Sequence, residues 1–120
     1  MNNLAFKCSN KKLIIFEIDK IVYFEKCIKK IIVHLEPSQK VEILNTSMNK
    51  LCTFLKDNNL LNTYFFRSHC SFIVNKKYIN IIKNRTIILN NHYEDEIPIS
   101  NSRKNEFKNM IKNNLTIFKI

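Results

Sequence analysis

Glycine is absent from this sequence of 120 residues, and proline occurs only twice. Without glycine there is no glycine-rich loop of the kind that cradles phosphate groups, and no pair of carboxylates stands out as a general acid and base. We therefore do not expect an enzyme. Turns that require a positive φ angle must use another residue. We expect the abundant asparagines to fill them, because asparagine adopts that conformation more readily than most residues.

Zinc-binding motifs and membrane-spanning segments are also missing. The four cysteines contain no C-x-x-C pair, and a metal site built from Cys27, His69, Cys70 or His92 has no support from spacing. No apolar run approaches the length of a membrane span, and the N-terminus has no long apolar segment of the signal type. We expect a cytoplasmic protein with reduced cysteines, no bound metal or cofactor and no membrane contact.

Acidic residues are scarce relative to basic ones, with 10 Asp and Glu against 20 Lys and Arg, and the formal net charge is +10. This excess favours a polyanionic partner such as nucleic acid, although a solvated basic surface is common in small proteins. Arginine occurs only at Arg67, Arg85 and Arg103. Lysine binds phosphate as a point charge but reads base edges less well than arginine. The composition therefore predicts phosphate attraction, with sequence readout left to a few residues.

The hydrophobic content of 45% is enough for one globular domain over residues 1–120. Short β-branched and aromatic runs, separated by polar turns, predict many short strands with local antiparallel connections. These runs cover residues 4–6, 13–18, 21–25, 31–35, 41–44, 65–66, 72–74, 78–82, 86–89 and a strand ending at 99. We expect the basic residues 26–30 to form a loop, Asn90 and Asn91 to form a hairpin turn, and the acidic run 92–96 to be a solvated strand end.

Two segments have helical periodicity, and each follows a cluster of N-capping side chains. After residues 45–47, the apolar stripe is Met48, Leu51, Cys52 and Leu55, and we interpret Cys52 as a small core residue. After residues 100–102, the stripe is Phe107, Met110, Ile111 and Leu115. The fold class predicted is mainly β, a single domain of short antiparallel strands with two short helices.

The most informative stretch runs from Phe65 to Asn75. Its ends are apolar, whereas its middle carries a guanidinium, an imidazole, a thiol and two hydroxyls. Burying any of these groups without a hydrogen-bond partner costs free energy. We expect this polar middle to lie at a bend or a sheet edge; the alternative is a half-buried strand whose Arg67 and His69 are satisfied. Arg67 is expected to pair with Glu25 or Asp57, and Asn75 to cap a turn.

The same stretch resembles the F-x-R-x-H-x-S-F/Y-x-V-N signature of the LytTR DNA-binding domain. Two flanking blocks resemble the same family: residues 21–25 are similar to its I-x-Y-I/F-E strand, and residues 97–100 to its I-P-V/I-S segment before the last helix. The order and spacing hold over residues 13–107. The resemblance implies stacked small antiparallel sheets that present loops along one side, in the output domain of a transcriptional regulator.

The resemblance also implies where double-stranded DNA would bind. In the family, three loops read bases in successive major grooves; typical sites are paired direct repeats occupied by two copies, and the domain commonly follows a receiver domain. The corresponding positions here are Lys29, Lys30, His69, Cys70, Ser71, Asn101 and Arg103. Arg and Lys can donate hydrogen bonds to O6 and N7 of guanine, Asn can pair with adenine, and Ser can reach a phosphate.

Two positions depart from the family pattern, and other functions stay open. Cys70 stands where Arg or Asn is common, and Asn101 where Arg is common, so Arg103 is expected to take over that task. One alternative is a non-enzymatic RNA-binding or protein-interaction module that uses the same basic face. Another is a Cys-dependent enzyme using His69 and Cys70, for which adjacency in sequence is insufficient. A redox switch at Cys70 is a further hypothesis, since nearby basic groups favour the thiolate.

Overall fold

The computed structural model describes residues 3–91 and 93–120. Short strands dominate it, joined by tight turns and three 3-10 segments. The strands are β1 (Asn3–Lys7), β2 (Leu13–Glu17), β3 (Ile21–Cys27), β4 (Lys30–Leu35), β5 (Gln39–Leu44), β6 (Phe65–His69), β7 (Phe72–Asn75), β8 (Ile79–Lys83), β9 (Thr86–Leu89) and β10 (Glu96–Pro98). The remaining elements are the helices α1 (Met48–Asp57) and α2 (Lys104–Asn114) and the 3-10 segments η1 (Ile18–Lys20), η2 (Lys76–Tyr78) and η3 (Asn101–Arg103).

The described strands form three antiparallel sheets. The largest has the order β5-β4-β3-β7-β6, the second has the order β10-β9-β8, and the third is the β1–β2 hairpin. Strand β3 lies at the centre of the largest sheet and begins with four consecutive buried residues. Alternate side chains of a strand point to opposite faces, so such a run requires both faces of the sheet to be covered.

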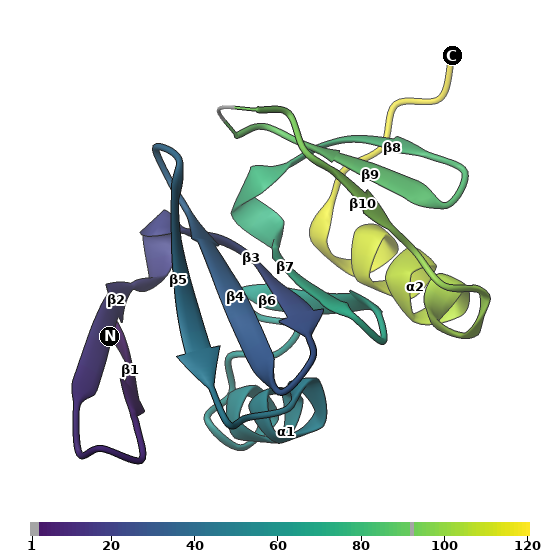
Figure 1. The fold of residues 1–120 in the computed structure, drawn as a ribbon. Helices are drawn as coiled ribbons and strands as arrows, with labels where there is room; N and C mark the ends of the chain where they lie inside the picture. The colour runs from purple at the N-terminus through teal and green to yellow at the C-terminus, as the bar shows by residue number, and fades with distance from the viewer. Residues whose placement is uncertain (1–2, 92) are drawn as a thin grey trace.

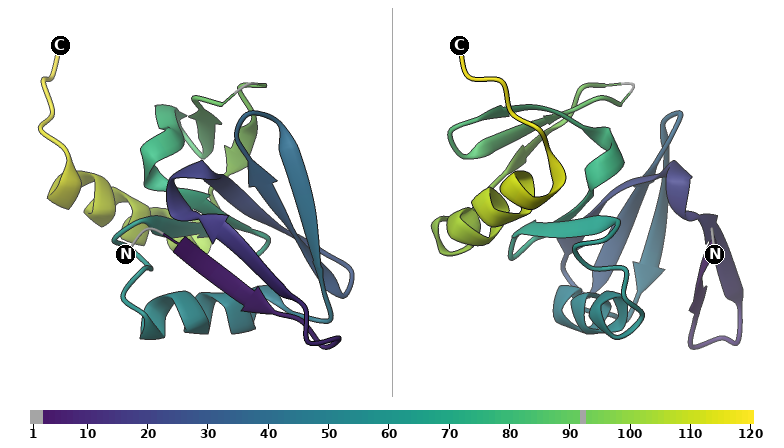
Figure 2. Two further views of the ribbon diagram at one scale, coloured as in Figure 1. Left: turned by 90° about the vertical axis from the view of Figure 1, so that its left-hand side faces the viewer. Right: turned by 180° about the vertical axis from the view of Figure 1, so that it is seen from behind.

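One face of the five-stranded sheet is covered by the β1–β2 hairpin and α1, and Figures 1 and 2 show both elements beside it. The ring of Phe6 lies between sheet and helix, 6.4 Å from the ring of Phe24 and 6.3 Å from that of Phe54. Ser47 caps α1 by accepting a hydrogen bond from the backbone N–H of Lys50 at 3.2 Å, as the sequence predicts. The buried members of this core are Leu4, Phe16, Ile18, Ile21, Phe24, Ile31, Val33, Ile43, Met48, Leu51, Leu55, Phe65 and Ile73.

The opposite face is covered by the three-stranded sheet and α2, on the right of Figure 1. Neighbouring residues of one strand divide between the two cores: Phe65 belongs to the first, whereas Phe66 packs 4.9 Å from the ring of Phe107 in the second. The buried members of this second core are Val22, Tyr23, Phe66, Val74, Tyr78, Ile87, Leu89, Ile97, Ile99, Phe107 and Met110. The prediction of a mainly β fold of stacked small antiparallel sheets with two short helices is confirmed.

Several local predictions are wrong in detail. The loop predicted over residues 26–30 is shorter in the structure, because β3 continues to Cys27 and β4 begins at Lys30. Asn90 and Asn91 are not a two-residue hairpin turn, since the segment between β9 and β10 runs over residues 90–95. Leu115 lies beyond the end of α2 and is 55% exposed, so it does not extend the apolar stripe.

Positive φ angles are found at seven described residues other than glycine, and asparagine fills four of them, at Asn45, Asn59, Asn62 and Asn84. The expectation that asparagine replaces glycine in such turns therefore holds only in part. Lys11, Lys29 and Glu94 occupy the other three. Each lies in an exposed turn, where the hydrogen-bonded backbone outweighs the modest penalty of a left-handed residue.

The acidic run 92–96 is not simply a solvated strand end. The Asp95 carboxylate accepts hydrogen bonds from the Tyr23 hydroxyl at 3.1 Å and from the Asn91 amide at 3.0 Å, and so ties the small sheet to β3. Burial, followed by the charge of Asp95, raises the pKa of Tyr23 above its ordinary value. His92 lies outside the described residues. No helix in the described part of the chain is long and apolar enough to cross a membrane.

Candidate functional site

Three turns that are distant in sequence adjoin at one edge of the molecule. The backbone N–H of Lys26, near the end of β3, donates to the carbonyl of Ser71 at 2.8 Å, and the N–H of Ser100 donates to the carbonyl of Ser68 at 2.8 Å. These two bonds join the β3–β4 turn, the β6–β7 turn and η3 in a row, which runs from the lower centre to the right of Figure 1. We call this row the turn edge; it consists of residues 28–30, 69–71 and 101–103. All seven sequence-predicted site residues lie on it.

The β3–β4 turn contributes two lysines in different states. Lys30 forms an ion pair with Glu42 on β5 at 2.6 Å, and this hydrogen bond and charge raise the pKa of the Lys30 amine. Lys29 is exposed at φ 59°, and its carbonyl accepts from the N–H of Asn45 at 2.9 Å. Ile28, beside them, is 90% exposed. Lys29 thus presents its charge to solvent, whereas part of the charge of Lys30 is compensated.

The β6–β7 turn is held by its own side chains. The Arg67 guanidinium donates to the carbonyl of Cys70 at 2.9 Å, so the expected ion pair with Glu25 or Asp57 is wrong. Glu25 instead lies 2.8 Å from the imidazole of the buried His34. A carbonyl at the end of a tight turn is nearer to Arg67 than either carboxylate, and it gives the guanidinium a structural role.

His69 is oriented by the same turn. Its Nδ1 accepts a hydrogen bond from the backbone N–H of Ser71 at 3.1 Å and lies 3.6 Å from the Sγ of Cys70. Because Nδ1 accepts, the neutral imidazole carries its proton on Nε2, which leaves that nitrogen as a donor. The Cys70 side chain is exposed beside it. The turn therefore presents an imidazole donor and a thiol that contacts a ring nitrogen.

Arg85, which lies outside the turn edge and is not among the site residues predicted from the sequence, contacts the third part of that edge. Asn101 in η3 accepts a hydrogen bond at its Oδ1 from the guanidinium of Arg85, which lies in the β8–β9 turn. The carbonyl of Arg85 also accepts from the N–H of Ile99 at 2.7 Å. Arg103 has a side chain 27% exposed and lies 3.9 Å from the carboxylate of Glu106. The scarcity of arginine was the one signal in the sequence that could have singled out Arg85.

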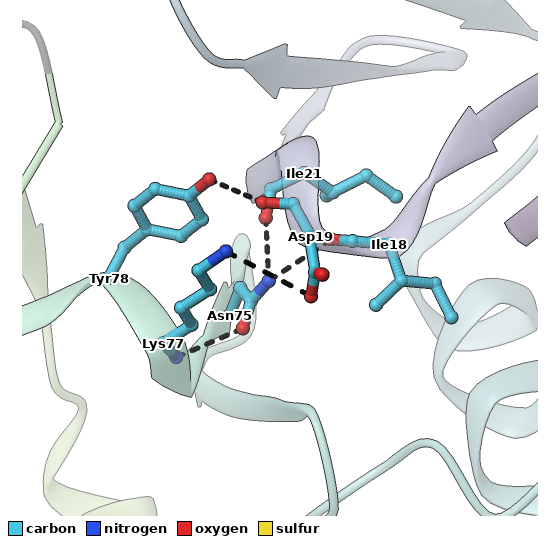
Figure 3. Close-up of polar contacts among 6 residues, drawn as sticks. All are labelled: Ile18, Asp19, Ile21, Asn75, Lys77 and Tyr78. Carbon is cyan, nitrogen blue, oxygen red and sulfur yellow. Dashed lines mark hydrogen bonds and ion pairs between the residues drawn. The ribbon is translucent and has the colours of Figure 1, made fainter. Parts of the chain in front are cut away.

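Asn75, the last residue of the signature, is structural (Figure 3). It is 2% exposed, and its amide Nδ2 donates to the carbonyls of Ile18 at 3.2 Å and Ile21 at 2.9 Å. Its Oδ1 accepts from the N–H of Lys77 at 3.0 Å, so the prediction that it caps a turn is confirmed. The hydroxyl of Tyr78 donates to a main-chain carbonyl of η1 from the same side. Asn75 thus joins β7 to the segment that leads into β3.

Metal binding has no geometric support in residues 3–91 and 93–120. No group of three or more His, Cys, Asp or Glu side chains in these ranges could hold a metal ion, and the four cysteines are free. Cys52 is half-buried and packs against the first core, in line with its interpretation as a small apolar residue. The chemistry available at the turn edge is therefore hydrogen-bond donation and positive charge, with a single exposed thiol.

Comparison with known proteins gives a consistent result. The sequence matches the family model of the LytTr DNA-binding domain over residues 11–112, a range that contains the whole turn edge. One similar solved structure is the LytTr DNA-binding domain of a protein designated a methyl-accepting/DNA response regulator from Bacillus cereus. It has a TM-score of 0.63 and 23% identity, and the match covers 92% of this chain and 97% of that chain. At this identity the likeness shows the shared fold. No curated protein matches the chain.

Proposed function

Because this chain belongs to the LytTR family of DNA-binding domains, we propose that it is a regulator's output domain that recognises specific sequences in double-stranded DNA through the turn edge. The observation that supports this proposal is the pair of backbone hydrogen bonds, from Lys26 to Ser71 and from Ser100 to Ser68. They hold three turns in one row, so a single duplex can meet all three. Loops fixed on packed sheets keep their geometry without placing a helix in the groove.

The proposed mechanism separates affinity from readout. Exposed lysines, Lys29 foremost, neutralise phosphates and release counterions, which gives binding a strong dependence on salt. His69, through its Nε2 proton, and Ser71 donate to base edges or phosphates. The carboxylate of Glu42 partly compensates the positive charge of Lys30, so Lys30 contributes less to DNA affinity than Lys29 does. The remaining proposed contacts with the duplex come from Cys70 in the β6–β7 turn and from Asn101 and Arg103 in η3.

The proposed assembly follows the family pattern. Residues 1–120 form one domain, two copies occupy a pair of direct repeats, and a receiver domain in the parent chain controls them in the cytoplasm. Each turn edge reads successive major grooves on one side of the duplex. Two weakly specific domains on one site then gain discrimination, because the second binding event occurs at a raised local concentration.

Selection of bound duplexes from a random pool tests this proposal. The expected result is a pair of spaced, similar repeats that bind the protein far more tightly than unrelated duplex does. Competition with single-stranded RNA separates the alternative: if RNA displaces the selected duplex at equal concentration, the basic face serves RNA or another partner. A pool that yields no shared sequence would contradict sequence-specific DNA recognition.

A further inference from the structure

We infer that Arg85 is a specificity-determining residue that makes the third loop select guanine and reject adenine. This inference rests on the proposed function and concerns the same turn edge. It comes from the contact between the Arg85 guanidinium and the Oδ1 of Asn101, which joins the β8–β9 turn to η3. Both side chains are exposed, so both can face a duplex lying against the turn edge.

The β8–β9 turn holds Arg85 in place. Lys83 and Thr86 are paired across the two strands, which leaves a two-residue turn in which Asn84 takes a φ of 48°. The carbonyl of Arg85 accepts the N–H of Ile99 at 2.7 Å, immediately before the chain enters η3. This hydrogen bond anchors the main chain of Arg85 to the segment that carries Asn101. The Arg85 side chain is therefore close enough to bond to the side-chain amide of Asn101.

The contact fixes the orientation of the Asn101 amide. A guanidinium has only N–H donors, so the amide atom that faces Arg85 must be the oxygen. The Nδ2 group then points away with its two N–H donors, while the Oδ1 gives one of its two lone pairs to Arg85. An adenine N6 amino group that used the second lone pair would have to approach beside the guanidinium cation, so the paired contact with N7 and N6 of adenine is disfavoured and Asn101 acts chiefly as a donor.

Guanine fits this arrangement better. Its major-groove edge presents two acceptors, N7 and O6, whereas adenine presents one acceptor and one donor. The Nδ2 of Asn101 and the remaining N–H groups of Arg85 together present mainly hydrogen-bond donors. Arg103, by contrast, has its guanidinium 3.9 Å from the carboxylate of Glu106 and a side chain only 27% exposed. Arg85 thus supplies a more accessible guanidinium to the same loop.

The test measures the affinity of the selected site and of variants carrying each base pair at each position. The wild-type protein is expected to prefer guanine over adenine at one position of each repeat by roughly 5- to 100-fold. In Arg85→Ala the Oδ1 of Asn101 no longer contacts a guanidinium. The preference should therefore fall at least fivefold, and the affinity for adenine should rise relative to that for guanine at this position. Arg85→Lys, whose ammonium still donates, should lie between the two. Lys83→Ala removes one positive charge from an exposed position on the same hairpin, and it should weaken binding to all duplex sequences alike.

The outcomes separate this inference from the proposed function. If wild-type protein selects specific duplexes but Arg85→Ala keeps the wild-type order of bases at every position, Arg85 does not determine specificity. A uniform loss of affinity in Arg85→Ala, equal to that in Lys83→Ala, would assign Arg85 to phosphate and would also overturn the inference. Failure of the wild-type protein to select any duplex would instead reject the proposed function itself. Circular dichroism of all three variants verifies that they are folded.

Discussion

Replacing Asn75 by alanine should lower stability without altering DNA recognition, although the residue belongs to the family signature. The side chain is 2% exposed and makes three hydrogen bonds: two to the carbonyls of Ile18 and Ile21, and one from the N–H of Lys77. The carbonyl of Ile18 keeps a second partner, the N–H of Ile21. The loss of three bonds of about 0.5–1.5 kcal/mol each, with buried groups left unpaired, predicts a decrease of about 2–4 kcal/mol in the free energy of unfolding.

Urea unfolding followed by circular dichroism measures this decrease, with Asn80→Ala as the matched control. Asn80 lies on β8 with its side chain exposed, and its replacement should change the unfolding free energy by less than about 0.5 kcal/mol. Asn75→Asp retains the acceptor for Lys77 but turns a carboxylate oxygen toward two carbonyls, so it should destabilise at least as much as alanine. The reasoning would be refuted if Asn75→Ala matched Asn80→Ala in stability but lost affinity for the selected duplex.

Four further predictions concern the turn edge and the junction between the sheets. Lys29→Ala should weaken binding to all duplexes alike and reduce the slope of log affinity against log salt by about 1, whereas Lys12→Ala, in the β1–β2 turn, should not; gel shifts at several salt concentrations measure both. Arg103→Ala should cost about 1–3 kcal/mol of binding free energy and relax base preference if it reads a base, as duplex competition would show. Oxidation of Cys70 should weaken binding to the selected duplex, and Cys70→Ser should make the affinity insensitive to oxidant. Unchanged affinity of the wild-type protein after oxidation would exclude a redox switch. Because burial raises the pKa of Tyr23, its neutral phenol stabilises the fold fully below pH about 10, and this contribution is lost as the pH rises further. Tyr23→Phe should therefore show a shallower alkaline fall in unfolding free energy than wild-type protein in a urea series at increasing pH.

Local sequence signals predicted most elements because strands and helices depend on nearby residues. The N-capping Ser47 and the spacing of Met48, Leu51 and Leu55 predict α1, and the aromatic pair Phe65 and Phe66 predicts a strand. The pairing of the strands was not accessible in the same way. Strand β3 is apolar on both faces, so periodicity alone could not show that β7 would pair with it, or that the β1–β2 hairpin would stand apart.

The sequence pointed to three segments that the structure brings to one edge, but it did not predict their contacts. Arg67 bonds to a carbonyl instead of a carboxylate, and Lys30 is paired with Glu42. The first contact depends on the geometry of a tight turn, and the second depends on the register of β4 and β5, which brings Lys30 near Glu42. The bond between Arg85 and Asn101 likewise requires the β8–β9 turn to meet η3.

The most direct test of the account is an NMR titration of the labelled protein with its selected duplex, following every backbone amide. If one edge of the molecule, formed by three turns, meets the DNA, the largest shift changes will cluster at residues 28–30, 69–71 and 101–103. The β1–β2 turn and the exposed face of α1 will then be unchanged. Changes concentrated on the hairpin or on α1, with the three turns unaffected, would contradict it.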